Sequence, residues 1–247
     1  MGGVPAFLIN SKGRAGKTTT DKLLDSIHVD YSFIVEPREE EVYHEKLSNY
    51  GSVITLPENG MGLPYSRNFA KEIASKHHKY FVLLDDDIKS FYRFENGKKI
   101  LLNPHVILET FEWFQNSGLA LVSYECIQFA WSNKEKISEM KPCDCCVFFN
   151  SEMTVDVHYD ERFKLKGDRD FCVQLAFLGR KFGRLNSVAI DVSKLGQGLG
   201  GLHQLYKDKE DEKYSILLFR KWGGKICKLI RKKNGRLDCK LNLKNMV

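Results

Sequence analysis

Three consecutive aspartates, Asp85-Asp86-Asp87, follow the apolar stretch 80–84. Adjacent carboxylates repel one another and burial disfavours each charged form, so such a triplet at the end of a buried strand needs a positive partner. A divalent cation meets this need, because oxygen ligands suit Mg²⁺ and Mn²⁺, and these ions often keep substrate phosphates in their coordination shell. The triplet therefore predicts a metal and phosphate site. The plain alternative is a solvated acidic loop that caps a helix.

A second group with chemical potential is the polar loop 11–17, which follows the apolar stretch 6–9. Its Gly-Lys-Thr end matches the end of a phosphate-binding P-loop, but Ser11 stands where that motif has its first glycine. A nucleoside-triphosphate hydrolase is one interpretation, although the mismatch removes the tight turn around the phosphate. Whether or not the protein is such a hydrolase, cationic side chains near a helix N-terminus suit a diphosphate. The loop supplies Lys12, Arg14 and Lys17.

Alternating strand and helix patterns predict how these loops are positioned. Strands are expected at 6–9, 31–35, 52–56 and 80–84, with helical segments between them. This βαβ alternation predicts a parallel sheet, in which ligands bind outside the carboxyl ends of the strands. The loops that follow the four strands should therefore line one crevice.

The pattern becomes less regular after Ile88. It predicts a hairpin over 91–102 with an Asn-Gly turn, and then further helices and strands; these fall near 105–116 (helix), 119–123 and 145–150 (strands), 168–179 (helix) and 187–192 (strand). A glycine-rich loop at 196–201 and a basic tail complete the sequence.

Composition bounds the class of protein. The 247 residues are 43% hydrophobic and 28% charged, which supports one folded domain, and no apolar run approaches the roughly 18 residues of a membrane span. The seven cysteines suggest no disulfide framework, and the cluster at 143–146 has no second ligand pair for structural zinc, so we expect a reducing cytoplasm. The net charge of +6 is concentrated after residue 219, which indicates a polyanionic partner.

The segment 56–68 followed by 81–87 resembles the donor half of GT-A glycosyltransferases, in which a glycine loop, a helix start with Arg-Asn and a strand ending in Asp-x-Asp follow one another. Together with the loop 11–17 and Val35-Glu36-Pro37, it is more specifically similar to the TET/JBP-associated glycosyltransferases (TAGT) of phages and related eukaryotic proteins. The resemblance implies an α/β, single-domain GT-A (Rossmann-like) fold with a mostly parallel central sheet flanked by helices. We expect this domain over 1–205, with a donor half at about 1–90 and an acceptor half at about 91–205, and a basic extension at 206–247 packed on it.

The resemblance also implies roles for individual residues. Asp87 and Asp85 would bind the metal, Mn²⁺ or Mg²⁺, with His203 after the glycine-rich loop as a further ligand. The base that accepts the proton of the acceptor hydroxyl would be Asp170 or Asp168 at the start of a helix, with Asp170 preferred; the alternative is that these residues only cap the helix. The expected donor-binding residues are Ser11, Lys12, Arg14, Lys17, Glu36, Asn59, Gly60, Arg67, Asp85 and Asp86.

The implied reaction is metal-dependent transfer of a sugar from a UDP-sugar to an acceptor hydroxyl. Family members are proposed to modify hydroxymethylated pyrimidines in DNA, so 5-hydroxymethylcytosine in DNA is the expected acceptor, in the cytoplasm of a host if the protein is phage-encoded. The basic tail fits a phosphate backbone, and four aromatic residues could stack on an extruded base: Phe129, Trp131, Tyr159 and Trp222. A polysaccharide or small-molecule acceptor, an NTP hydrolase and a non-catalytic DNA-binding module are the alternatives.

Overall fold

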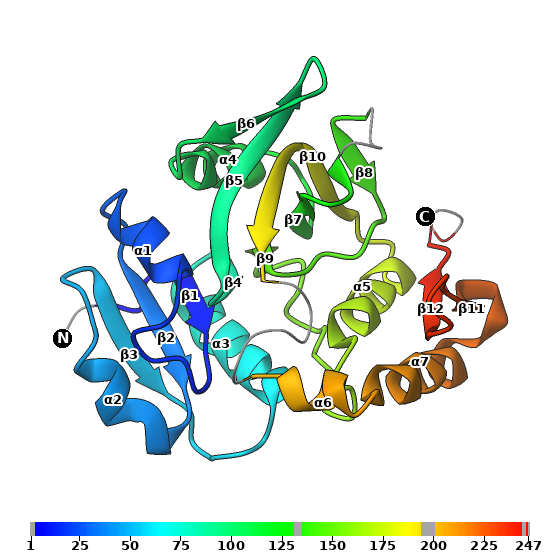
Figure 1. The fold of residues 1–247 in the computed structure, drawn as a ribbon, viewed down its shortest axis with the longest axis horizontal. Helices are drawn as coiled ribbons and strands as arrows, with labels where there is room; N and C mark the ends of the chain where they lie inside the picture. Colours follow the sequence, from blue (N-terminus) through cyan, green and yellow to red (C-terminus); the bar gives the residue numbers. More distant parts are fainter. Residues whose placement is uncertain (1–2, 131–134, 194–200, 244–245, 247) are drawn as a thin grey trace.

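The computed structural model describes residues 3–130, 135–193, 201–243 and 246. The N-terminal half alternates strands and helices as the hydrophobic pattern predicts (Figure 1). Its elements are β1 (Phe7–Asn10), α1 (Thr20–Asp25), β2 (Tyr31–Val35), a 3-10 turn (Pro37–Glu39), α2 (Glu40–His44), β3 (Gly51–Thr55), α3 (Leu63–His77) and β4 (Tyr80–Asp85).

The second half is built mainly of strands that return to the same sheet. Its elements are β5 (Ile88–Glu95), β6 (Lys98–Leu102), α4 (Val106–Gln115), β7 (Leu121–Cys126), β8 (Ile137–Glu139), β9 (Cys146–Asn150), α5 (Gly167–Phe177) and β10 (Phe182–Val192). The predicted hairpin is β5 and β6, whereas β10 begins five residues before the predicted strand because Phe182 to Leu185 are buried beside β7.

One sheet runs through the molecule in the order β3-β2-β1-β4-β9-β7-β10-β5-β6, with β8 paired to β10. Its first four strands are mutually parallel, as are β7 and β10. The intervening β9 pairs antiparallel with both β4 and β7, so the sheet is mixed beyond β4. This α/β architecture, a single large sheet flanked by helices, agrees with the predicted fold class.

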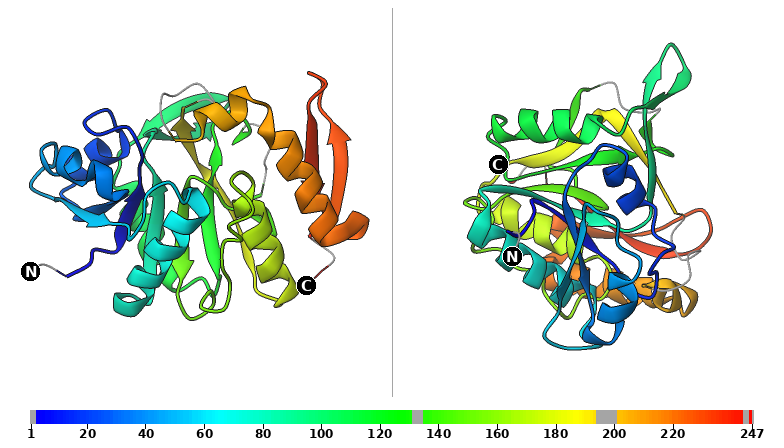
Figure 2. Two further views of the ribbon diagram at one scale, coloured as in Figure 1. Left: turned by 90° about the horizontal axis from the view of Figure 1, so that it is seen from below. Right: turned by 90° about the vertical axis from the view of Figure 1, so that its left-hand side faces the viewer.

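Two apolar layers hold the helices against the sheet, because alternate side chains of each buried strand point to opposite faces. In β1, Phe7 and Ile9 pack in the layer that includes α1 and α4, while Leu8 packs in the layer that includes α3 and α5. Figure 2 shows α3 and α5 side by side on one face of the sheet. The starts of these two helices come from the two halves of the chain, which brings the donor and acceptor segments together.

The basic C-terminal residues are folded into helices and a hairpin. These elements are the short α6 (His203–Lys207), α7 (Glu210–Ile226), β11 (Cys227–Arg231) and β12 (Leu237–Leu241). A third apolar cluster joins Tyr214 and Leu218 of α7 to Phe163 and Leu165, the residues that precede α5. Cys227 and Cys239 form a disulfide across the hairpin. The sequence did not indicate it, because only the β11–β12 pairing brings these two positions close.

Candidate functional site

The first loop is fastened to the strand that carries the aspartates. Ser11 is buried at the end of β1, and its hydroxyl contacts the Tyr43 hydroxyl and donates to the Asp86 carboxylate. Arg14 Nη1 lies 2.5 Å from Asp86 Oδ1. Burial raises the pKa of Asp86, although Ser11 and Arg14 partly offset this. Both Ser11 and Asp86, predicted to bind the donor, are therefore engaged inside the protein.

The backbone of this loop is also held by its neighbours. The Gly13 N–H donates to Glu39 Oε1 over 2.8 Å, and the Arg14 N–H donates to the Tyr43 hydroxyl over 3.3 Å. A P-loop instead aims such N–H groups at a phosphate. The loop therefore lacks the backbone cradle of a P-loop, while the exposed Lys17 side chain stands on the solvent side of it.

Glu36, at the end of β2, gathers several of the predicted donor residues. Its carboxylate lies 2.5 Å from Lys12 Nζ and 2.8 Å from Arg38 Nη2. Burial opposes the charged form, but Lys12, the Gly60 N–H and Arg38 together hold the pKa of Glu36 below its ordinary value. Asn59 accepts a hydrogen bond from the Arg38 N–H, so the loop after β3 is tied to the loop after β2.

Arg67, on the first turns of α3, reaches across to the end of β4. Its Nη2 lies 2.8 Å from Asp85 Oδ1, and its guanidinium lies 5.6 Å from the centre of the Tyr159 ring. Burial opposes the charge on Arg67, but Asp85 and, more weakly, Asp168 raise its pKa above the ordinary value. An arginine from the donor half thus lies within the electrostatic influence of an acid from α5.

Among the three aspartates, Asp87 has the negative charge that nearby cations compensate least. Arg14 Nη1 lies 3.7 Å away, and the Asp87 side chain remains 25% exposed. Burial and the charges of Asp85 and Asp86 raise the pKa of Asp87 to about 6, against weaker opposing effects of Arg14 and a hydrogen bond from Ser193. This excess of negative charge at a partly open site is what a divalent cation would neutralise.

Within the described ranges no three His, Cys, Asp or Glu side chains are gathered closely enough to form a metal-binding group. His203 begins α6, half-buried, on the far side of the predicted glycine-rich loop. Residues 194–200 of that loop lie outside the described part of the chain. Its described flanks both reach the site: Ser193 bonds Asp87, and a Cβ placed on Gly201 would be 3.8 Å from Arg14 Nη2.

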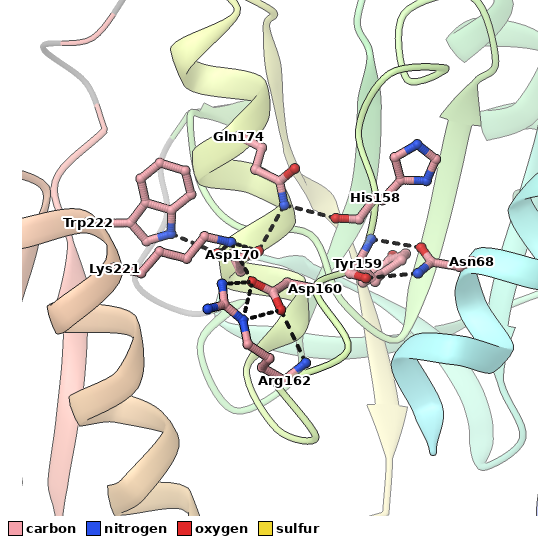
Figure 3. A network of polar contacts seen from close by, with 9 residues as sticks. All are labelled: Asn68, His158, Tyr159, Asp160, Arg162, Asp170, Gln174, Lys221 and Trp222. Atoms are coloured by element: carbon pink, nitrogen blue, oxygen red, sulfur yellow. Dashed lines mark hydrogen bonds and ion pairs between the residues drawn. The ribbon is translucent and has the colours of Figure 1, made fainter. Parts of the chain in front are cut away.

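The two aspartates at the start of α5 have different environments, and Figure 3 shows that of Asp170. Asp170 is 0% exposed, and its carboxylate accepts hydrogen bonds from Gln174, Lys221 and Trp222. Asp168 is half-buried, and its charge acts on Arg67, Tyr159 and Asp144. The preceding Gly167 packs near Tyr159 and Pro64, at the starts of both helices. Of the two, Asp168 is the one that keeps partial exposure, and its charge acts on Arg67, the partner of Asp85.

Two polar residues that sequence reasoning missed also lie at this edge of the sheet. Asn10 pairs in register with Asp85; its side-chain oxygen accepts from Ser66, while its buried Nδ2 has no partner among the described residues. Asp144 is bonded through Oδ2 to Arg184 at 2.7 Å, and its buried Oδ1 likewise has no partner in the described chain. In the sequence, only the position of Asn10 at the end of a predicted strand could have indicated it as a site residue. Nothing in the sequence indicated Asp144.

The four aromatic residues proposed for base stacking differ in exposure. Tyr159 is 5% exposed, and the centre of its ring lies 4.6 Å from the centre of the Phe171 ring, so it belongs to the core. Trp222 stacks on Phe177 and donates its Nε1–H to Asp170. Neither presents a free ring face. Phe129 is 52% exposed, and Trp131 lies outside the described residues.

A family model described as TET-Associated Glycosyltransferase matches residues 6–201, most of the chain. The chain belongs to this family. This TET-associated glycosyltransferase is therefore a transferase enzyme, as predicted. The match ends before α6, so α7 and the β11–β12 hairpin lie beyond it.

A solved structure titled "Crystal Structure of a Mycobacterial Protein" shares the fold of this glycosyltransferase, with a TM-score of 0.54 and 10% identity over 98% of this chain and 84% of that one. No curated protein matches the glycosyltransferase. None of the helices that the structure describes is long and apolar enough to span a membrane.

Proposed function

We propose that the protein transfers a sugar from a UDP-sugar to the hydroxyl of a hydroxymethylated pyrimidine, 5-hydroxymethylcytosine, in DNA. The observation that carries the proposal is the meeting of three segments: the end of β4 with Asp85 and Asp87, the start of α3 with Arg67, and the start of α5 with Asp168. The end of β4 contributes carboxylates suited to a metal-bound diphosphate, α3 contributes a buried cation, and α5 contributes a candidate base.

Asp85 and Asp87 would hold Mn²⁺ or Mg²⁺, which would supply positive charge opposite the diphosphate leaving group. Arg14, 3.7 Å from Asp87, and Lys12, which pairs with Glu36 at the end of β2, would add to that charge. The loop containing Asn59 and Gly60 would form the adjoining surface for the nucleoside, and the buried Glu36 holds Lys12 and Arg38 beside it. Asp86 and Ser11 hold the first loop in place and make no direct donor contact in this proposal.

Asp168 is the base in this proposal, and it replaces the preferred Asp170. A base must have a carboxylate oxygen free to accept the hydroxyl proton. Asp170 has its carboxylate surrounded by three donors and no exposed surface, whereas Asp168 is partly open and near Arg67. A helix N-terminus also favours the ionised form that a base requires.

The exposed cations of α7 and the C-terminal hairpin support a DNA acceptor, because lysine and arginine bind the phosphate backbone without regard to sequence. The exposed cations that form no ion pair within the described chain are Arg220, Lys225, Lys228, Arg231, Lys233 and Lys240. Other basic residues of the segment are used internally: Lys221 pairs with Asp170, and Arg236 with Asp211. The partner surface is therefore smaller than the sequence suggested.

The test is release of UDP from a panel of UDP-sugars with Mn²⁺, with and without duplex DNA that contains 5-hydroxymethylcytosine. The proposal expects release that depends on both metal and modified DNA. Asp87→Ala should abolish it, and Asp168→Asn should lower the transfer rate by about 10²-fold or more, in the range of a lost general base. Asp170→Asn should instead lower the amount of folded protein.

Release that needs metal but ignores the DNA would overturn the acceptor and favour a polysaccharide or small molecule. If Asp168→Asn transferred sugar at the wild-type rate, the base assignment would be wrong. Both conclusions require that each variant be folded, which circular dichroism establishes.

A further inference from the structure

The residues around Asp168 are held by a part of the chain that lies beyond the family match. Asp168 sits in the first turn of α5, and its sequence neighbours Lys166, Arg169 and Asp170 each contact α7 or the β11–β12 hairpin. The residue before the helix, Lys166, has a φ of 64° and provides no side-chain cap. The start of the helix therefore depends on contacts from elsewhere for its orientation.

The first anchor is Asp238 of β12, which is 3% exposed. It lies 2.7 Å from Lys166 Nζ and 2.9 Å from Arg169 Nη1, and Arg169 also donates to the carbonyl of Cys239 over 2.5 Å. Burial opposes the charge of Asp238, but Arg169, Lys166 and Lys232 hold its pKa well below the ordinary value. The carboxylate thus links the residues on both sides of Asp168 to the hairpin.

The second anchor is Asp170, which Figure 3 shows at the centre of a polar network. Lys221 Nζ lies 2.8 Å from it, and Trp222 Nε1 donates over 2.7 Å, so two adjacent residues of α7 hold one carboxylate. Lys221 also lies 2.8 Å from Asp160, in the segment before α5. The helix start and the segment leading into it are therefore attached to the same turn of α7.

The charge of Asp168 acts on Arg67 of the donor half and on Tyr206 of α6. Lys166, Arg169 and Asp170, on both sides of Asp168, are held by the C-terminal elements, so the anchors fix the backbone that carries its carboxylate. Charged groups this buried tolerate little displacement, because removing one partner leaves the other without compensation.

We propose that α7 and the β11–β12 hairpin act as a positioning clamp for Asp168, with Lys221 and Asp238 as the positioning residues. The proposal rests on the proposed function, in which Asp168 is the base. A displaced base loses rate without losing donor affinity, since a shift of about 1 Å can cost around 10²-fold in a reaction that depends on orientation.

The experiment compares Lys221→Met and Asp238→Asn with the wild type and with Lys213→Met. Lys213 is the matched control, because it is a lysine of the same helix that pairs only with Glu210 on the surface, away from α5. With a UDP-sugar, Mn²⁺ and 5-hydroxymethylcytosine DNA, the two clamp variants should lose about 10-fold or more in kcat for transfer and keep the KM for the donor. Lys221→Arg, which keeps a cation for Asp170, should recover much of the loss.

A second readout does not depend on activity. Amide hydrogen exchange of residues 166–170 should rise about 10-fold or more in both clamp variants while exchange in α3 and β4 stays unchanged, and Lys213→Met should match the wild type throughout. Unchanged exchange at 166–170 would overturn the clamp, whatever the activity. A wild-type kcat in both clamp variants would also overturn the clamp, provided that Asp168→Asn is inactive. Full activity of Asp168→Asn would instead overturn the base assignment of the proposed function.

Discussion

The three consecutive aspartates illustrate how neighbouring residues of one type take different roles. Asp86 points into the protein and fastens the first loop through Ser11 and Arg14. Asp85 pairs with Arg67, and Asp87 keeps a quarter of its side chain exposed. The backbone explains the difference, because Asp85 ends β4 whereas Asp86 and Asp87 form the turn before β5, so the three side chains do not share one direction. Only the two outer members of the triplet remain near the proposed ligand.

The raised pKa of Asp87 makes a prediction about stability without metal. Its folded pKa of about 6 exceeds the ordinary 3.8, so the native state binds the proton more tightly than the unfolded chain. The ionised carboxylate therefore destabilises the fold above about pH 6, and this cost is relieved as pH falls from 6 to 4. Asp87→Asn should stabilise the chelator-treated protein at pH 7 by up to about 3 kcal/mol.

Urea denaturation at several pH values in the presence of EDTA would measure this effect. The stability difference between Asp87→Asn and wild type should shrink as pH falls below 6 and vanish near pH 4. A difference that stays constant over this range would show that Asp87 is not under electrostatic strain. Added Mn²⁺ should stabilise the wild type more than the variant if the metal binds there.

At the scale of elements, the site depends on how α3 and α5 approach one another. Asn68, next to Arg67 on α3, donates to the Tyr159 carbonyl and accepts from the Tyr159 N–H, both over 2.8 Å (Figure 3). Gln174 of α5 in turn donates to the carbonyl of the adjacent His158. The segment before α5 is thus bonded to both helices, which keeps Arg67 and Asp168 on one side of the site.

Replacing Asn68 with aspartate should loosen this connection. A carboxylate can still accept from the Tyr159 N–H, but its second oxygen would face the Tyr159 carbonyl where the amide donated. Leaving that buried carbonyl without a donor should lower the free energy of unfolding by about 1–3 kcal/mol. Chemical denaturation measures it, with Asn242→Asp as an exposed control expected to change stability by less than about 0.5 kcal/mol. Equal effects of the two substitutions would contradict the role given to Asn68.

For the whole molecule, the main feature is the placement of charge. The C-terminal segment divides its cations between internal pairs, such as Lys221 with Asp170 and Lys232 with Asp238, and an exposed set on α7 and the hairpin. Lys228 and Lys240 are exposed and lie directly opposite one another across the hairpin. Facing lysines repel, so an anionic partner would relieve a cost that the free protein carries.

The double substitution Lys228→Thr with Lys240→Thr should weaken DNA binding and leave folding intact, because threonine suits a strand and the change removes a repulsion. The slope of log affinity against log salt should decrease in magnitude by about 2 if both lysines contact phosphates. Fluorescence anisotropy with a DNA duplex at several salt concentrations gives this slope. An unchanged slope would place the DNA surface elsewhere.

Local pattern was enough to determine much of this protein. The strand and helix periodicities of the first 85 residues, the aspartates after β4 and the glycine loop before α3 depend on residues near one another in sequence, and they were sufficient to predict the fold class and the family. Lys12, Glu36 and Asn59, grouped by the sequence as donor residues, lie at one edge of the sheet because loops after neighbouring parallel strands must meet there.

The tertiary structure decided which members of these groups are open to a ligand. Asp168 and Asp170 are indistinguishable by sequence, and only α7, some 50 residues later, buries one of them with Lys221 and Trp222. Asp86 is closed off by Ser11, 75 residues earlier, and Asp144 is brought to the site by the return of β9 beside β4. Burial and charge compensation depend on contacts distant in sequence, so they appear only when the chain is folded.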